Sequence, residues 1–438
     1  MLFPFDFSLK KPHAGSSRYA VGINRRIKRR IALTSIYENG FILPGWCVFL
    51  NIFMTTDDLI ASGNLAREQH NPEKAIAFYA QAFVQDPNHS GAFNNYGNVL
   101  REMGHTQRAI PFLETARLLD PASVTAEFNL AVAHLMLGNY EQGWKLYESR
   151  WRYEHLEGTK PRLPSPEWSG EDLRDKTILV IGEQGLGDQI QFLRFCGNLQ
   201  DLGAKIRLHV SPGIKPLLIN TPPAIVEITC NTEDVIGPFD YWVAMMSLPR
   251  LLNMRLENVQ HYLQYVQPDP ERVKVWTERL GISKNRMRVG VAWSGRKDSW
   301  INQHKSMPAA TMAELVRKFP EHQWVSLQVD ASEEDTAVIK AAGVECYPGT
   351  INDFADTAAL MHHLDLVISV DTAAAHLAGA MGRPVWIPLN SYGPCWRWMQ
   401  NRDDSPWYTT ARLFRQEKYG DWSAPMAKIA KFLGWFKI

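Results

Sequence analysis

A 34-residue period in the first third of the chain constrains its fold more than any other feature. Pro87 is followed 34 residues later by Pro121, and Gly63 by Gly97. The same spacing separates further small or large apolar residues: Ala75 and Ala109, Ala82 and Ala116, Tyr79 and Leu113, then Gly104 and Gly138, Ala109 and Gly143, Leu113 and Tyr147. Small residues let two helices approach closely, a large side chain fills the gap between units, and Pro ends a helix. The period therefore predicts stacked helix-turn-helix units.

The spacing and residue types resemble tetratricopeptide repeats, of which roughly three would span residues 56–155. Three units are near the minimum for a stable stack. We assign residues 54–157 to these repeats; an unrelated helical bundle is the alternative. The stack is expected to bind a peptide or protein partner in its concave face, or to form a dimer contact.

Composition excludes several classes of protein. A chain of 438 residues with 45% hydrophobic and 21% charged residues is typical of a globular protein of two or three domains. A net charge of +1 gives no electrostatic reason to expect nucleic acid as a partner. The five cysteines are scattered without a CxxC pair, which argues against a disulfide framework or a zinc site. No apolar run reaches the roughly 20 residues that a spanning helix needs. We expect a cytoplasmic bacterial protein, or one peripheral to the inner membrane.

We expect domain boundaries where the residue composition of the chain changes. We interpret residues 1–53 as a disordered or artefactual extension and residues 158–176, rich in Pro, Ser and charge, as a linker. After residue 176, apolar runs alternate with helical stretches, which indicates parallel sheets covered on both faces. We predict two doubly wound halves at 177–267 and 285–421, an interdomain helix at 268–284, and an amphipathic helix at 422–438 that packs back across the first half.

Three predicted strand-to-helix junctions carry polar residues, and ligands of doubly wound folds bind at such junctions. The first is GEQGLGDQIQF (182–192). Its glycines run G-x-x-G-x-G, which is not the dinucleotide fingerprint. Asp188 begins the next helix. It is either a helix N-cap or a general base that takes a proton from an acceptor hydroxyl.

The second junction is VAWSGRKDSWINQHKSMP (291–308), where a strand ends at Ser294 and a polar loop follows. A departing diphosphate needs cations or backbone amides to hold its charge. Lys305 is the leading candidate for this role and Arg296 the second. The alternative is that both are solvated loop charges.

The third junction is VISVDTAAAHLAGAMGRPVWIPL (367–389). It delivers Asp371 and Thr372 to a helix N-terminus, where free amides and the helix dipole favour an anion. Ala373 and Ala374 are small enough for a phosphate or sugar to approach the backbone. The Asp371 carboxylate suits sugar or ribose hydroxyls, unless it only caps the helix. His376, one turn further, is expected to be a packing histidine.

Two of these motifs resemble a known family. DTAAAHLAGAMGRP and QGLGDQIQF are similar to the donor site and the N-terminal Leu-Gly-Asp loop of the heptosyltransferase-like glycosyltransferases, glycosyltransferase family 9. The resemblance covers roughly residues 56–430, counting bacterial proteins that join such repeats to this domain. It implies a GT-B fold and inverting, metal-independent transfer from a nucleotide-diphosphate sugar, with no cofactor. Ala373 departs from the family's usual Gly, and the repeats stand in place of a lipopolysaccharide-binding element.

The resemblance also implies roles for individual residues. Asp188, next to Gly187, would be the catalytic base, and Lys305 would hold the donor phosphate. Asp371, Thr372 and His376 would belong to the donor site, which we extend to Gly187, Ser294, Arg296, Ala373 and Ala374.

We therefore expect a glycosyltransferase that acts on a glycan or protein acceptor, with repeats that bind the acceptor or a partner. One alternative is a non-catalytic repeat scaffold with a degenerate transferase domain. The joint presence of Asp188, Lys305 and Asp371 argues against such decay. A nucleotide-sugar 2-epimerase of the same architecture is a second alternative, but it would need neither an acceptor nor repeats.

Overall fold

The structure is a computed structural model that describes residues 54–153, 159–218, 224–230, 236–259, 264–282, 286–295 and 304–435. In this part of the chain, residues 138–144 and those from 160 onward form one compact unit, here called the α/β unit. Residues up to 137 and 145–159 form the other, the repeat unit. The expected extension at 1–53 and Arg296 lie outside the described residues.

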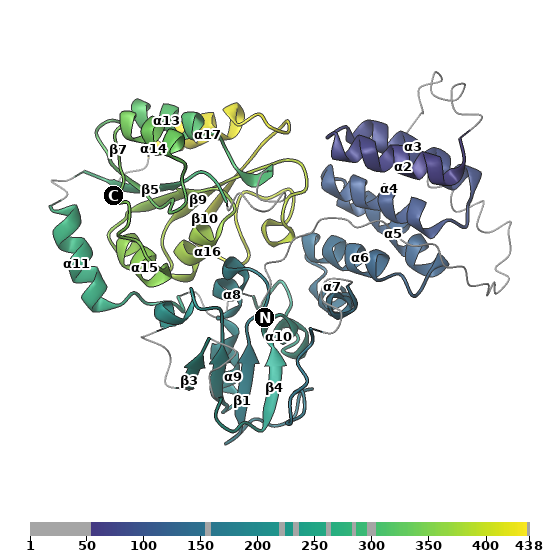
Figure 1. The fold of residues 1–438 in the computed structure, drawn as a ribbon, viewed down its shortest axis with the longest axis horizontal. Coiled ribbons are helices and arrows are strands. Elements are labelled where there is room, and N and C mark those ends of the chain that lie inside the picture. The colour runs from purple at the N-terminus through teal and green to yellow at the C-terminus, as the bar shows by residue number, and fades with distance from the viewer. Residues whose placement is uncertain are drawn as a thin grey trace. The chain divides into compact units, whose positions relative to one another are not determined.

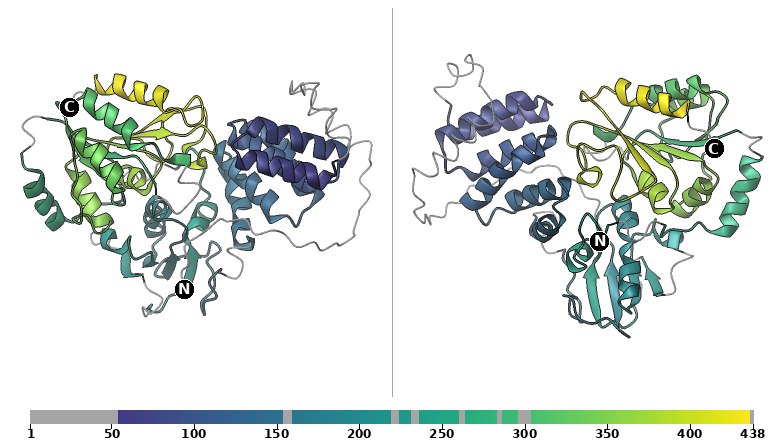
Figure 2. Two further views of the ribbon diagram at one scale, coloured as in Figure 1. Left: turned by 45° about the horizontal axis from the view of Figure 1, so that its top comes forward. Right: turned by 180° about the vertical axis from the view of Figure 1, so that it is seen from behind.

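The repeat unit consists of antiparallel helices stacked side by side (Figures 1 and 2). They are α2 (Thr56–Glu68), α3 (Pro72–Gln85), α4 (Ser90–Glu102), α5 (Thr106–Leu119) and α6 (Val124–Met136). The next helix, α7 (Tyr140–Tyr147), belongs to the α/β unit up to Trp144 and to the repeat unit from Lys145, and it is continued by the 3-10 helix η1 (Glu148–Arg152). Capping residues determine where these helices begin. Thr55 and Asp58 form a capping box at α2, and Asn71 caps α3 just before Pro72. The predicted helix-turn-helix repeats are confirmed.

The 34-residue period has a direct packing cause. A Cβ atom at Gly63 would lie 2.4 Å from Cε1 of the Tyr79 ring, and one at Gly97 would lie 2.8 Å from Cγ of Leu113. Tyr79 and Leu113 are both completely buried. The first two repeats thus need a glycine on their first helix so that the large side chain on the second helix can reach the backbone, whereas the third has Ala131 at this position.

The α/β unit contains two parallel sheets. The first has four strands in the order β3-β2-β1-β4, each pair parallel. Its strands are β1 (Thr177–Ile181), β2 (Lys205–His209), β3 (Ile225–Thr229) and β4 (Tyr241–Ala244); its helices are α8 (Leu186–Phe192), α9 (Phe195–Asp201), η2 (Lys215–Leu218), η3 (Met245–Ser247) and α10 (Leu248–Leu251). The middle residues of β1 are fully buried, as expected of a strand covered on both faces.

The second sheet has six parallel strands in the order β10-β9-β8-β5-β6-β7. These are β5 (Arg288–Ala292), β6 (Gln323–Ser326), β7 (Val344–Glu345), β8 (Leu366–Ser369), β9 (Val385–Leu389) and β10 (Ala411–Arg415). Their helices are α11 (Pro270–Leu280), α13 (Ala309–Lys318), α14 (Glu333–Ala341), α15 (Phe354–His362), α16 (Ala373–Ala380), η4 (Trp396–Trp398) and α17 (Ser423–Leu433). Helices α13, α14 and α17 cover one face of this sheet, and α15 and α16 the other (Figure 1). The predicted pair of doubly wound halves is confirmed.

The last helix is not where we expected it. Met426, Ile429 and Leu433 of α17 belong to the core of the second sheet, where the helix packs on β9 and β10 beside α13. The prediction that this helix packs back across the first half was therefore wrong. Its amphipathic pattern requires a sheet to cover but does not say which one.

The boundary between the two units also differs from the expected linker. Tyr140 and Trp144 of α7 belong to the α/β unit, where the Trp144 ring lies 5.8 Å from that of Phe192 and 5.2 Å from that of Trp396. The expected linker is attached along β4, because the Trp168 amide donates to the Trp242 carbonyl at 2.8 Å.

Strand order fixes where a ligand can bind. In the first sheet the order in which successive strands are added reverses between β1 and β4, and in the second between β5 and β8. In doubly wound folds, ligands bind in the crevice outside the carboxyl ends of the strands at such reversal points. The segments after β1, β5 and β8 are those that carry Asp188, Lys305 and Asp371.

Candidate active site

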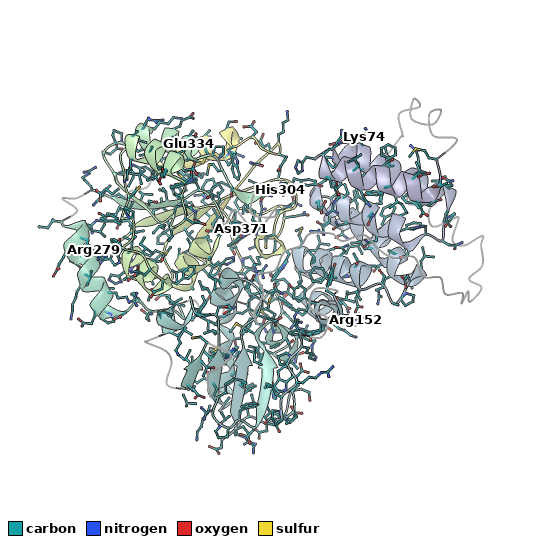
Figure 3. The ribbon with its side chains drawn as sticks, in the orientation of Figure 1. Lys74, Arg152, Arg279, His304, Glu334 and Asp371 are labelled. Atoms are coloured by element: carbon teal, nitrogen blue, oxygen red, sulfur yellow. The ribbon has the colours of Figure 1, made fainter. Side chains whose placement is uncertain are left out.

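The reversal point of the second sheet brings Lys305 and Asp371 together. Asp371 follows β8 and Lys305 belongs to the connection after β5, the neighbouring strand. The Lys305 ammonium lies 2.6 Å from Oδ2 of Asp371, and the two side chains are 16% and 5% exposed. Asp371 and the neighbour of Lys305, His304, lie at this edge of the sheet (Figure 3). Asp371 is thus held in an ion pair.

Burial and pairing act in opposite directions on this pair. Burial alone would lower the pKa of Lys305, but the Asp371 carboxylate more than offsets it, so that the pKa is raised. Burial would likewise raise the pKa of Asp371, but the charge of Lys305 and the proximity of His376 lower it. Both groups are therefore charged near neutral pH.

Helix α16 begins without a side-chain cap. Thr372 occupies the N-cap position, but its hydroxyl lies 3.0 Å from that of Ser369 and does not bond to the first turn of the helix. By contrast, Ser332 and Asp353 cap α14 and α15 in the same half. In the first turn of α16, Ala373 and Ala374 are half-buried and small, whereas Ala375 is buried and its amide donates to the Thr372 carbonyl at 3.1 Å. Such a helix start attracts an anion.

His376 both packs and faces the ion pair. Its Nδ1 lies 2.9 Å from the Tyr408 hydroxyl, and its ring stacks on Trp398 with centroids 5.2 Å apart. Its Nε2 lies 3.7 Å from Oδ1 of Asp371. Burial lowers the pKa of His376 to about 4 despite the nearby carboxylate, so the ring is neutral at pH 7. The expected packing role is present, and it orients the ring toward Asp371.

Asp188 lies in the first turn of α8. Gly185 occupies the N-cap position and Asp188 is the third residue of the helix, so the alternative that Asp188 is the N-cap was wrong. Its carboxylate instead reaches back and accepts a hydrogen bond of 2.8 Å from the Gly185 amide. The same carboxylate lies 2.5 Å from Nη2 of Arg397, a residue of the second half. Neighbouring Gly187 explains the close approach of α8 to α16, because a Cβ there would lie 3.0 Å from Cδ2 of His376. Asp188 therefore lies beside the start of α16.

The sequence analysis missed Arg397. This residue lies on η4, the 3-10 helix that follows β9, and its guanidinium stacks over the Trp396 ring at 4.2 Å. Its Nε donates to Oε1 of Gln191 at 2.6 Å, and its Nη1 to Sγ of Cys395 at 3.3 Å. The segment PCWRWMQ (394–400), with Arg between two Trp after a buried strand, was the available signal.

Of the other two residues predicted for the site, the structure describes Ser294 but not Arg296. Ser294 follows β5, and its amide donates to Oε1 of Gln328 at 3.1 Å, which ties together the ends of β5 and β6. His304, which the sequence analysis did not assign to the site, hydrogen-bonds to Tyr419, and the rings of Tyr419 and Tyr392 lie 5.6 Å apart. The residue that precedes Lys305 is thus held by aromatic side chains that follow β9 and β10.

Among the residues that the structure describes, no group of three or more His, Cys, Asp or Glu side chains is placed to hold a metal ion. The described helices also include none that is long and apolar enough to cross a membrane.

Parts of the chain are similar to known proteins. Residues 260–394 match the sequence model of Glycosyltransferase family 9 (heptosyltransferase). Protein FlbA of Caulobacter vibrioides is 29% identical over 386 residues; the match covers 82% of this chain and 64% of that protein's length. The fold is similar to the family 9 glycosyltransferase of Veillonella parvula (14% identity, TM-score 0.47, 60% of this chain and 98% of that one). It is also similar to E. coli ADP-heptose LPS heptosyltransferase II (15% identity, TM-score 0.44, 59% of this chain and 97% of that one).

Proposed function

We propose that this chain, which carries a glycosyltransferase family 9 domain, transfers a sugar from a nucleotide-diphosphate sugar to a hydroxyl of a glycan or protein acceptor. One observation carries the proposal: the buried Lys305–Asp371 pair lies at the reversal point of the second sheet, beside the uncapped start of α16. That arrangement offers a cation and free amides for a diphosphate, and a carboxylate for sugar or ribose hydroxyls.

The proposed reaction is a single displacement with inversion. Asp188 takes the proton of the acceptor hydroxyl, and the oxygen attacks the anomeric carbon from the face opposite the nucleotide. The bond between that carbon and the diphosphate oxygen breaks, and its electron pair leaves with the nucleoside diphosphate. Lys305 and the amides of Ala373 and Ala374 stabilise the charge that develops on the leaving group.

His376 and Thr372 support this site in the proposed mechanism. His376 is neutral at pH 7 and is fixed by Tyr408 and Trp398, so that it can orient Asp371 without adding a charge. Thr372 places the start of α16 against the end of β8 through its contact with Ser369.

The test is a thermal-shift and transfer panel with ADP, GDP, UDP and their common sugars, each with and without excess chelator. We expect one donor to stabilise the protein, by about 2.7 kcal/mol at 100 times its Kd, and the chelator to have no effect. Asp371→Ala should abolish that stabilisation, and Arg402→Gln, at an exposed ion pair with Asp404, should not. If no nucleotide stabilises the protein, the scaffold alternative replaces this proposal; if chelator abolishes transfer, the metal-independent mechanism is wrong.

We further propose that the repeat unit binds the acceptor or a protein partner. Helical repeats present an extended concave surface to polypeptides. Deletion of the repeats should then impair transfer to the natural acceptor while leaving nucleotide stabilisation intact.

A further inference from the structure

We propose that Arg397 binds the donor diphosphate, and that in the free protein its guanidinium is held instead by Asp188. Binding of the donor would then release the catalytic base, so that Asp188 is available to an acceptor only when the donor is present. This inference rests on the proposed function and adds to it a residue and an order of binding.

The site contains two ion pairs, each between one cation and one carboxylate. Lys305 lies 2.6 Å from Asp371, and Arg397 lies 2.5 Å from Asp188. The charges of these four side chains sum to zero. A nucleoside diphosphate brings at least two negative charges into this region, and charge-assisted hydrogen bonds from cations are the usual means of holding them. The diphosphate therefore competes with a carboxylate for at least one of the two cations.

The two carboxylates differ in how well they tolerate the loss of their cation. The Asp371 side chain is 5% exposed, so removing Lys305 would leave a buried charge uncompensated, which is costly. The Asp188 side chain is 23% exposed and keeps the hydrogen bond from the Gly185 amide. Separation of Asp188 from Arg397 is therefore the less costly exchange.

The surroundings of Arg397 suit a phosphate ligand. Stacking on Trp396 and the hydrogen bond to Gln191 fix the plane of its guanidinium while its Nη2 points toward Asp188. The charge of Arg397 also acts against the protonation of Lys305, so the two cations lie within electrostatic reach of each other. Two neighbouring cations would both be stabilised by an anion bound between them.

The movement of Arg397 from Asp188 to the diphosphate would allow Asp188 to act as a general base. While Arg397 holds the carboxylate, the guanidinium occupies the position from which a hydroxyl would donate its proton. A general base must be within hydrogen-bond reach of that proton. When the donor binds, Arg397 moves to its diphosphate and the position beside the Asp188 carboxylate becomes open to the acceptor hydroxyl. The donor should therefore bind before the acceptor.

The test compares variants by calorimetric titration with ADP, GDP and UDP, and with the matching nucleosides, which lack phosphate. Asp188→Asn keeps the shape and the helix cap but removes the charge that competes for Arg397. We expect it to tighten binding of the preferred nucleoside diphosphate by roughly fivefold, with nucleoside binding unchanged. Arg397→Gln should weaken diphosphate binding by about tenfold or more, and in the double variant Asp188→Asn should no longer tighten it. Arg402→Gln is the matched control for loss of an arginine.

The outcomes separate this inference from the proposed function. If the unaltered protein binds a nucleoside diphosphate but Asp188→Asn leaves its affinity unchanged or weaker, Arg397 stays on Asp188 and the inference is wrong. If the unaltered protein binds none of the nucleotides or their sugars, the proposed function itself fails. If Arg397→Gln does not fold, the affinities of Asp188→Asn for diphosphate and for nucleoside still test the inference. That variant leaves the contacts of Arg397 with Gln191 and Trp396 in place.

Discussion

Replacement of Lys305 by Met tests the electrostatic core of the site. The substitution keeps most of the side chain's length and removes the charge that lies 2.6 Å from Asp371, whose side chain is 5% exposed. Removing one partner of a buried ion pair typically costs 3–5 kcal/mol because the other charge is left uncompensated, so we expect a loss of about 3–5 kcal/mol in the free energy of unfolding. The double variant Lys305→Met with Asp371→Asn should recover much of this loss, since it leaves no buried charge.

Denaturant unfolding followed by tryptophan fluorescence is the appropriate assay. Among the described tryptophans, Trp151 alone belongs to the repeat unit, so the signal reports mainly on the α/β unit. A loss below about 1 kcal/mol, the value of an exposed pair, would refute the reasoning that the pair is buried. A double variant no more stable than the sum of the two single variants would refute it equally.

The pH dependence of the same variant has a defined sign. The pKa of Asp371 is lowered in the folded protein, so its contribution to stability is present above the unfolded pKa of 3.8 and is lost as pH falls through the folded value. The pKa of Lys305 is raised, so its contribution is present below 10.5 and is lost as pH rises through the folded value. The difference between the original protein and Lys305→Met should therefore shrink at both ends of the pH range.

Three further predictions concern packing and protonation. Gly63→Ala should destabilise the repeat unit in far-UV circular dichroism melts despite the roughly 1 kcal/mol gained in helix propensity, because its Cβ would lie 2.4 Å from Cε1 of Tyr79; unchanged melting would contradict the packing account. Gly187→Val should cost about 1–3 kcal/mol in the fluorescence assay, since a Cβ there already meets Cδ2 of His376 at 3.0 Å, and a neutral result would mean that α8 moves freely over α16. The pKa of His376 is about 4 in the folded protein against an ordinary value of 6.5, so stability should fall by on the order of 3 kcal/mol as pH drops through that window; His376→Asn should remove this term, and an equal fall in the variant would assign it elsewhere.

The parts that sequence could predict depend on short-range patterns. The glycine and the large side chain that meet in the first two repeats are 16 residues apart, as Gly63 and Tyr79 show, and the contact recurs at Gly97 and Leu113. Buried strands reveal themselves as apolar runs, and the first polar residue after such a run marks the carboxyl edge of the sheet. The apolar runs alone were therefore enough to place Asp371 at the end of a strand, and Asp188 and Lys305 in the segments that follow strands.

The parts that sequence could not predict depend on distant partners. Arg397 and its acceptor Gln191 are 206 positions apart, and nothing in either segment specifies the other. An amphipathic pattern likewise tells that α17 must cover a sheet, but both sheets offer an apolar face. The pairing of Lys305 with Asp371 required the strand order, because only the adjacency of β5 and β8 brings their following segments together.

The position of the unit boundary inside α7 matters for how this protein can be dissected. Tyr140 and Trp144 are almost completely buried in the α/β unit, against Phe192, Trp396 and Trp407. A shortened chain that begins at the Pro-rich segment after residue 157 would lack both rings and expose the aromatic faces they cover, at a cost of about 3–5 kcal/mol for each large ring lost. A shortened chain that begins at Gly138 would retain them. The repeat unit and the α/β unit therefore cannot be separated at the Pro-rich segment, because the first half of α7 is part of the α/β unit.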